Sequence, residues 1–321
     1  MRHGIFCVII NNHSKIWGGQ MKKIPVILDV DTGIDDAVAI ALATYNHNLD
    51  VRAITCVAGN CSVGRVAVNT LNILQAINRT EILVAEGARK PLVRDREENM
   101  SYHGRTGLGE YRFEPLRINT SLIDAVTEMR EIILSCEQKI TLICLGPLTN
   151  IATLLTKYPE VKTNIELIAI SGGLLDDDKN NPYPSFNVSI DPEAAEIVLK
   201  SGVNLRICPS DMGHIAYLCP QEIVKMSVLN KTGKMFETIF QSYHDRHVKV
   251  GAAMHDSCCV ACISNPELMN IEKMHVELKM ISSEVGVLDF DTTKPSNMEV
   301  VTQIHQNAFK KLFFDELNLM P

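Results

Sequence analysis

Short apolar runs alternate with amphipathic stretches along nearly the whole chain from Ile24 onward. A near-continuous apolar run suits a strand buried on both faces, whereas apolar residues at helical spacing suit a helix with one buried face. Alternation of the two is typical of parallel strands covered by helices on both sides. We therefore predict an α/β fold with one open, mostly parallel, doubly wound sheet flanked by helices.

The apolar runs also predict individual elements. Strands are expected at 24–28, 51–58, 82–85, 140–145, 167–170 and 205–208, with further candidates at 274–282 and 298–304. Helices are expected at 35–45, 63–77, 121–136, 150–157, 192–200, 221–247 and 252–263, with a closing helix from 307. Neither an internal repeat nor a low-complexity linker divides the sequence, so we predict a single catalytic domain over residues 21–321.

Residues 1–20 are expected to be an N-terminal extension, disordered or added by an alternative start. Met21-Lys22-Lys23 directly precedes the first predicted strand. The apolar run at 5–10 is too short for a membrane span and lacks a convincing cleavage site. The extension therefore takes no part in the fold prediction.

Charge and cysteine content limit the partners and the compartment. Lys and Arg total 31 against 38 Asp and Glu, and the formal charge of -7 argues against binding nucleic acid or anionic lipid by bulk electrostatics. A small-molecule substrate is the expected partner. Ten cysteines without a regular framework are typical of buried thiols in a reducing compartment, so we expect the cytoplasm.

The most informative segment is an acidic cluster where the first predicted strand gives way to a helix. It holds four aspartates within eight residues: Asp29, Asp31, Asp35 and Asp36. In open α/β sheets, ligands bind outside the carboxyl ends of the strands. Two unit charges about 4 Å apart repel by roughly 4 kcal/mol at an effective dielectric near 20, so converging carboxylates need a raised pKa or a cation.

Oxygen-only ligation favours Ca²⁺ or Mg²⁺ over zinc, and the cluster contains neither His nor Cys. We therefore infer a bound divalent cation. For any one of these aspartates alone, the alternative is a helix N-terminal acid that complements the helix dipole, or a solvated turn residue.

The segment from Asp29 to Ala37 resembles the aspartate-rich signature of the calcium-dependent nucleoside hydrolases of the inosine-uridine preferring type, with Thr32 in place of the usual proline. Further segments match that family in order: Val57-Ala58-Gly59-Asn60, Tyr102-His103-Gly104, residues 145–150, residues 186–195 and Met254-His255-Asp256. The resemblance spans residues 24 to about 265.

This resemblance implies a ribonucleoside hydrolase that cleaves purine or pyrimidine nucleosides to free base and ribose, as a homodimer or homotetramer. It implies Ca²⁺ as the cofactor, held by Asp31, Asp36, Asp256 and the backbone carbonyl of Leu145. By motif position, the ribose hydroxyls or the Ca²⁺-bound water would be met by Asp35, Asn60 and Asn187. We count Asn60 with the catalytic residues.

The chemistry agrees with an anionic site. Breaking an N-glycosidic bond develops positive charge on the sugar, which carboxylates stabilise. Ca²⁺ would position the water and the ribose hydroxyls while Asp31 removes the water proton as general base. The leaving base needs a proton or a hydrogen bond, and a histidine can supply it near neutral pH, with His255 as the leading candidate.

Other residues are candidates for contact with the nucleobase. Tyr243 and His247 are four residues apart and share one face of the predicted helix. His103 lies on a glycine-rich loop and could approach from another side. For Tyr243, His244 and His247, an ordinary solvent-facing or core position is an equally good interpretation.

Two further positions depart from the family pattern. The family commonly carries a glutamate for the ribose 5′ end where this chain has Ser185, which keeps one hydrogen bond but loses the charged acceptor. A methionine is common where this chain has Ser171. Because the predicted metal ligands are intact, a change of substrate preference is favoured over loss of catalysis.

Two other functions remain open at this point. Asp29-Val30-Asp31 after an apolar strand also fits an aspartate-nucleophile phosphotransferase or phosphatase, although Gly33 stands where that pattern has threonine. A catalytically weak paralogue that binds nucleosides and retains Ca²⁺ is the other alternative, supported by the change at Ser185.

Overall fold

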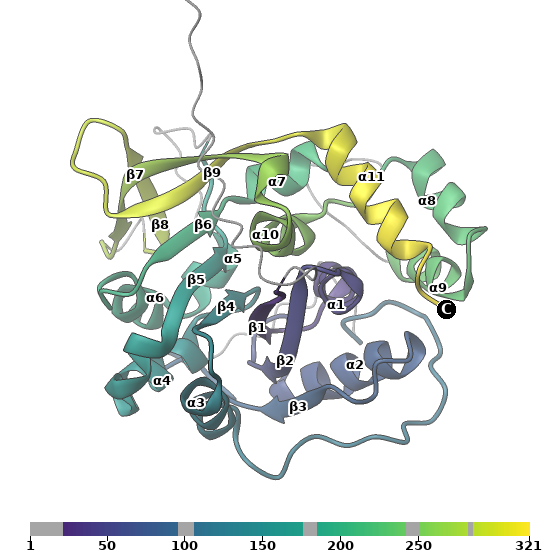
Figure 1. Cartoon of the computed structure of the whole chain (residues 1–321), viewed down its shortest axis with the longest axis horizontal. Coiled ribbons are helices and arrows are strands. Elements are labelled where there is room, and N and C mark those ends of the chain that lie inside the picture. The colour runs from purple at the N-terminus through teal and green to yellow at the C-terminus, as the bar shows by residue number, and fades with distance from the viewer. Residues whose placement is uncertain (1–21, 96–105, 176–184, 242–250, 282–284) are drawn as a thin grey trace, which may run out of the picture.

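The computed structural model describes residues 22–95, 106–175, 185–241, 251–281 and 285–321. Its strands form one sheet in the order β3-β2-β1-β4-β5-β6-β9-β7-β8 (Figure 1). The parallel strands are β1 (Ile24–Val30), β2 (Leu49–Cys56), β3 (Leu83–Glu86), β4 (Ile140–Cys144), β5 (Ile165–Ser171), β6 (Leu205–Cys208) and β9 (Met298–Ile304). Two antiparallel strands, β7 (Met269–Lys279) and β8 (Val287–Asp291), extend the sheet beyond β9.

The order of the strands reverses at β1. The chain winds outward from β1 to β2 and β3, and then returns to place β4 on the other side of β1. In doubly wound sheets, ligands bind in the crevice at such a reversal, outside the carboxyl ends of the two strands. The residues that follow β1 and β4 therefore occupy the expected position of a site.

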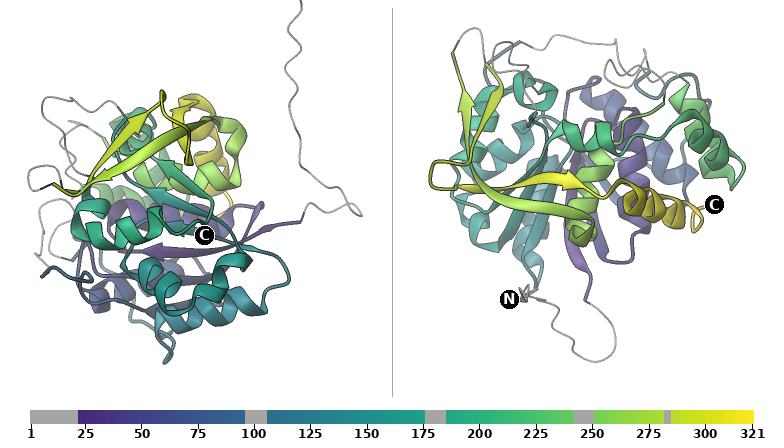
Figure 2. Two further views of the ribbon diagram at one scale, coloured as in Figure 1. Left: turned by 90° about the vertical axis from the view of Figure 1, so that its left-hand side faces the viewer. Right: turned by 90° about the horizontal axis from the view of Figure 1, so that it is seen from above.

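Helices cover both faces of the sheet (Figures 1 and 2). One face carries α1 (Ile34–Tyr45), α2 (Val63–Ala76), α7 (Ser210–Ile215), α8 (Pro220–Ser227), α9 (Lys231–Phe240), α10 (His255–Ser264) and α11 (Gln306–Leu317). The other face carries α3 (Ala125–Ser135), α4 (Thr149–Lys157), α5 (Phe186–Ile190) and α6 (Pro192–Leu199). Two short 3₁₀ helices follow α4 and α10, at Pro159–Asn164 and Pro266–Leu268.

Helices α1 and α10 pack against each other in the core. Both are buried along most of their length, and small residues make up much of each, Ala37, Ala39, Ala41 and Ala43 on α1 and Cys258, Cys259, Ala261 and Cys262 on α10. Small side chains let two helices approach closely. The first turns of both helices thereby reach the same edge of the sheet.

The predicted α/β class, with an open and mostly parallel sheet, is confirmed. The closing helix is also confirmed, and it brings the C-terminus against α9, where the Thr232 N–H donates to the Pro321 carbonyl at 2.9 Å (Figures 1 and 2). Strand β8 and helices α5 and α7 were not predicted. None of the helices in the described ranges is long and apolar enough to cross a membrane.

Several predicted boundaries are wrong, for local reasons. The helix predicted at 221–247 is two helices up to residue 241, because Asn230 caps α9 by accepting a hydrogen bond from the Gly233 N–H at 2.8 Å, and its end at 242–247 lies outside the described residues. The helix predicted at 252–263 begins at residue 255, because Ala252 exchanges backbone hydrogen bonds with Leu218. The helix predicted at 121–136 begins at residue 125, where Asp124 caps it. The strand predicted from 274 already begins at 269.

Asp191 ties three segments together from a fully buried position. Its carboxylate accepts hydrogen bonds from Thr149 Oγ1 at 2.7 Å, the Leu92 N–H at 2.9 Å and the Ala194 N–H at 3.1 Å. The last of these bonds caps α6.

We expect Asp191→Ala to lower the free energy of unfolding by about 3 kcal/mol, because it removes the cap and leaves buried donors without a partner. Asp124→Ala is the matched control, since Asp124 is an exposed N-cap whose loss should cost about 1 kcal/mol. Urea unfolding followed by circular dichroism measures both. Equal losses in the two variants would contradict the buried role of Asp191.

Candidate active site

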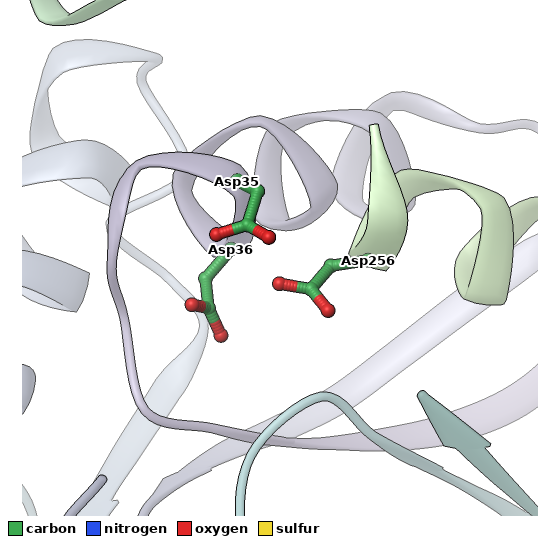
Figure 3. Close-up of side chains that lie close together, drawn as sticks. All are labelled: Asp35, Asp36 and Asp256. Atoms are coloured by element: carbon green, nitrogen blue, oxygen red, sulfur yellow. The ribbon is translucent and has the colours of Figure 1, made fainter. Parts of the chain in front are cut away.

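Three carboxylates converge at the carboxyl edge of the sheet. One oxygen from each of Asp35, Asp36 and Asp256 lies within 4.8 Å of the other two. Figure 3 shows the side chains pointing toward one another, with Asp35 and Asp36 on the first turn of α1 and Asp256 on the first turn of α10. The acidic N-terminal turns of two helices thus meet at one point, where both helix dipoles favour negative charge.

The turn between β1 and α1 fixes Asp36 and Asp31. Asp36 Oδ2 accepts a hydrogen bond from the Gly33 N–H at 2.8 Å, which caps the helix, and Asp36 Oδ1 accepts from the Asp31 N–H at 3.3 Å. Asp31 Oδ2 accepts from the Asn60 N–H at 2.7 Å, and Asn60 Nδ2 lies 3.4 Å from Asp36 Oδ2. Asn60 therefore links the two carboxylates across the switch point of the sheet.

The turn after β4 closes the other side of the site. Asn187 Nδ2 donates to the Leu145 carbonyl at 2.5 Å and to the Ser171 carbonyl at 3.1 Å. A Cβ atom on Gly146 would lie 3.0 Å from Asp31 Cβ, so a glycine is what lets this turn approach β1 so closely. The structure brings the predicted residues Asp31, Leu145 and Asn187 into one region.

His255 begins α10 and is held by its ring. Its Nδ1 lies 3.0 Å from the Ser210 carbonyl, which can only accept, so Nδ1 carries the proton of the neutral ring. Nε2 is then the nitrogen that can take up or give a second proton. The His214 ring packs edge-on with its centroid 4.8 Å away, and Gly213 allows this approach because a Cβ there would lie 2.3 Å from Nδ1.

A second layer of hydrogen bonds lies behind the cluster. Asp29 Oδ1 accepts from Thr55 Oγ1 at 2.6 Å and from Asn150 Nδ2 at 2.8 Å. The Asn150 amide also bonds the Cys56 carbonyl at 3.0 Å and the Ala88 N–H at 2.8 Å. Neither Thr55 nor Asn150 is among the site residues predicted from the sequence, although Asn150 ends one of the family segments.

Electrostatics in the site disfavour ionised carboxylates. Burial raises the pKa of Asp29 to about 7. Burial first, and the charges of Asp35 and Asp29 after it, raise the pKa of Asp31 to about 8. The pKa values of Asp36 and Asp256 are also well above the ordinary range, through burial and then through repulsion by the neighbouring aspartates.

These groups fit a divalent cation. In the part of the chain that the structure describes, the residues acting on Asp31, Asp36 and Asp256 are other carboxylates and uncharged hydrogen-bond donors. A hard cation with oxygen ligands would offset the repulsion and favour the ionised forms. The cluster can therefore hold a metal ion.

The remaining predicted site residues divide into two groups. Ser185 is buried beside the site at the start of α5, and a Cβ on Gly172 would lie 2.6 Å from its Oγ. His103, Tyr243, His244 and His247 lie outside the described residues, so their assignment to the base pocket stays a prediction.

Gly59 controls the position of Asp31. A Cβ atom at Gly59 would lie 2.0 Å from Asp31 Oδ2, whereas a Cβ at Gly64 meets nothing within 4 Å. We expect Gly59→Ala to displace the carboxylate and weaken the binding of a divalent cation about tenfold or more, with Gly64→Ala as the unaffected control. Calorimetric titration of chelator-treated protein measures both affinities. Wild-type affinity in Gly59→Ala would show that Asp31 does not need its observed position.

Comparisons with known proteins agree with this geometry. The family model described as inosine-uridine preferring nucleoside hydrolase matches residues 26–311. The non-specific ribonucleoside hydrolase RihC of Escherichia coli O127:H6 is 36% identical over 304 residues, covering 93% of this chain and 100% of the relative.

Solved structures give the same result. A purine-preferring ribonucleoside hydrolase from Gardnerella vaginalis superposes with a TM-score of 0.85 at 25% identity, covering 92% of this chain and 98% of that one. A plant nucleoside hydrolase, PpNRh1, also has a TM-score of 0.85 at 25% identity, with 92% and 99% covered. The predicted enzyme class, a hydrolase of N-glycosyl compounds, is confirmed. This chain belongs to the inosine-uridine preferring nucleoside hydrolase family.

Proposed function

We propose that this chain hydrolyses the N-glycosidic bond of ribonucleosides to free base and ribose, with Ca²⁺ as its cofactor. The observation that carries the proposal is the meeting of Asp35, Asp36 and Asp256 at the switch point of the sheet, beside Asp31. Helix capping accounts for an acidic residue on the first turn of a helix, but it does not account for three carboxylates that meet at one point. Binding of a cation accounts for their meeting.

Asp31, Asp36, Asp256 and the Leu145 carbonyl would hold the cation, as the sequence predicts. A Ca²⁺ ion bound there would supply positive charge that lowers the pKa of a nearby water and orients vicinal hydroxyls. Asp36 and Asp256 are anchored for this role by the Gly33 N–H and the Ser171 hydroxyl.

Asp31 acts as the general base. Its Oδ2 is held by the Asn60 N–H, which orients the carboxylate without neutralising it. As a water attacks the anomeric carbon, Asp31 accepts one proton of that water and the bond from carbon to base nitrogen breaks. Positive charge develops on the ribose, and the surrounding aspartates stabilise it.

The ribose hydroxyls bind to Asp35, Asn60 and Asn187. These side chains come from α1, the loop after β2 and α5, and they contact or border the carboxylate cluster. Holding the sugar by its hydroxyls aligns the anomeric carbon with the attacking water, which supplies much of the rate enhancement in hydrolytic enzymes.

His255 protonates the leaving base. Because Nδ1 donates to the Ser210 carbonyl, the proton that leaves must come from Nε2 of the protonated ring. The edge-on His214 ring fixes the plane of His255. Transfer of this proton to the base nitrogen completes the reaction with neutral base and free ribose.

A broad substrate range is supported by the relatives, since RihC is named a non-specific ribonucleoside hydrolase. Ser185 offers the ribose 5′ end one hydroxyl and no charge. The homodimer or homotetramer, the cytoplasmic location and the division into an extension at 1–20 and a catalytic domain at 21–321 stay predictions from the sequence.

A panel of common ribonucleosides with detection of reducing sugar tests this proposal. The wild-type chain should release ribose, lose activity in a Ca²⁺ chelator and regain it when Ca²⁺ is restored. Asp31→Asn should lower kcat about 10³-fold because it removes the general base. Asp50→Asn is the control and should not lower kcat, since Asp50 is exposed and pairs with Arg52 at the surface. Phosphate release from sugar phosphates without base release would favour the phosphotransferase. Tight nucleoside binding without ribose release would favour the binding paralogue.

Substitution of His255 should depend on the leaving group. We expect His255→Ala to slow nucleosides with poorly leaving bases about 10²-fold, and to have little effect on an aryl riboside whose leaving group needs no proton. His305→Ala, at an exposed position before α11, is the control. Steady-state kinetics on both substrate types measure the difference. Equal slowing of the nucleosides and the aryl riboside would rule out the acid role.

A further inference from the structure

Ser171 is the last residue of β5 and contacts the site through both its side chain and its backbone. Its Oγ lies 2.9 Å from Asp256 Oδ1, and its carbonyl accepts from Asn187 Nδ2 at 3.1 Å. The side chain is buried, and so is its partner. The hydroxyl must be the donor, because an ionised carboxylate only accepts.

This hydrogen bond restricts the Asp256 carboxylate. Asp256 lies on the first turn of α10, and the carboxylate whose Oδ1 Ser171 engages is the one that forms the cluster with Asp35 and Asp36. Hydrogen bonds to charged groups contribute more than those between neutral groups.

We propose that Ser171 is a positioning residue that fixes the Asp256 carboxylate for cation binding. The inference rests on the proposed function, since it assumes that the cluster holds Ca²⁺. Ser171 does not itself contact the cation or the substrate. Ser171 raises the affinity of the site for the cation. Asp31 and His255 carry out the proton transfers on the bound substrate.

Ser171→Ala isolates the hydroxyl, because the variant keeps the backbone carbonyl that binds Asn187. Ser257→Ala is a matched control. Ser257 adjoins Asp256 on the same helix turn and is fully buried, but the described residues supply no hydrogen-bond partner for its hydroxyl. Ser171→Thr keeps a hydroxyl at the end of a strand, where a β-branched residue is well tolerated.

Calorimetric titration of each chelator-treated variant with Ca²⁺ alone is the primary measurement. We expect the dissociation constant of Ser171→Ala to rise about tenfold or more, that of Ser257→Ala to stay within about twofold of wild type, and Ser171→Thr to recover most of the loss. At saturating Ca²⁺, kcat for nucleoside hydrolysis by Ser171→Ala should return to within about threefold of wild type, because loss of an outer-layer hydrogen bond weakens the hold on the cation and leaves Asp31 and His255 in place.

Several outcomes would overturn the inference. Wild-type affinity in Ser171→Ala would do so, as would an equal loss in Ser257→Ala, which would indicate general loosening of α10. If Ser171→Thr folds but does not recover Ca²⁺ affinity, the loss of affinity in Ser171→Ala comes from the change in side-chain size and not from loss of the hydroxyl. A wild-type chain that binds no Ca²⁺ would overturn the metal assignment of the proposed function together with this inference, whereas Ca²⁺ binding that is insensitive to Ser171 would overturn the inference alone.

Discussion

Mutual repulsion among buried aspartates is the constraint to which the rest of the site responds. Asp31, Asp36 and Asp256 all lie out of water, and burial and their neighbours' charges raise each pKa. Uncompensated, this arrangement opposes folding. The protein sustains it because two helix N-termini converge there and because backbone N–H groups of Gly33 and Asn60 bind the carboxylates. These contacts hold the carboxylates together without placing a positive charge beside them.

The donors that support the cluster are uncharged. Thr55 and Asn150 hold Asp29, Asn60 holds Asp31, and Ser171 holds Asp256. A lysine or arginine in these places would pair with the carboxylates and cancel the negative potential. That potential has two uses in a nucleoside hydrolase, since it attracts a divalent cation and stabilises the positive charge that develops on the sugar. Uncharged donors fix the positions of the carboxylates and leave the negative potential of the site in place.

Much of this could be predicted from the sequence, because parallel strands buried on both faces have a strong apolar signal and β1 to β6 follow it. Residues that closely follow a strand end, such as Asp31 directly after β1 and Asp36 on the first turn of α1, could also be placed. The contacts of Ser171 and Thr55 could not, since each depends on which distant segment packs against the strand. The break at Asn230 depends on one side-chain cap. The hairpin of β7 and β8 carries half-exposed, mixed residues, so its pattern is weak.

Cation binding and the stability of the site are linked through α1 and α10. Their first turns carry Asp36 and Asp256, and the two helices pack against each other in the core. A ligand that binds only the folded chain stabilises it by about 2.7 kcal/mol at a hundredfold excess over its dissociation constant. A cation bound by Asp36 and Asp256 would act where the carboxylates repel each other most, and it would hold the first turns of α1 and α10 together. The close packing of α1 on α10, which first looks like ordinary core structure, is therefore what places Asp36 and Asp256 where one cation would contact both.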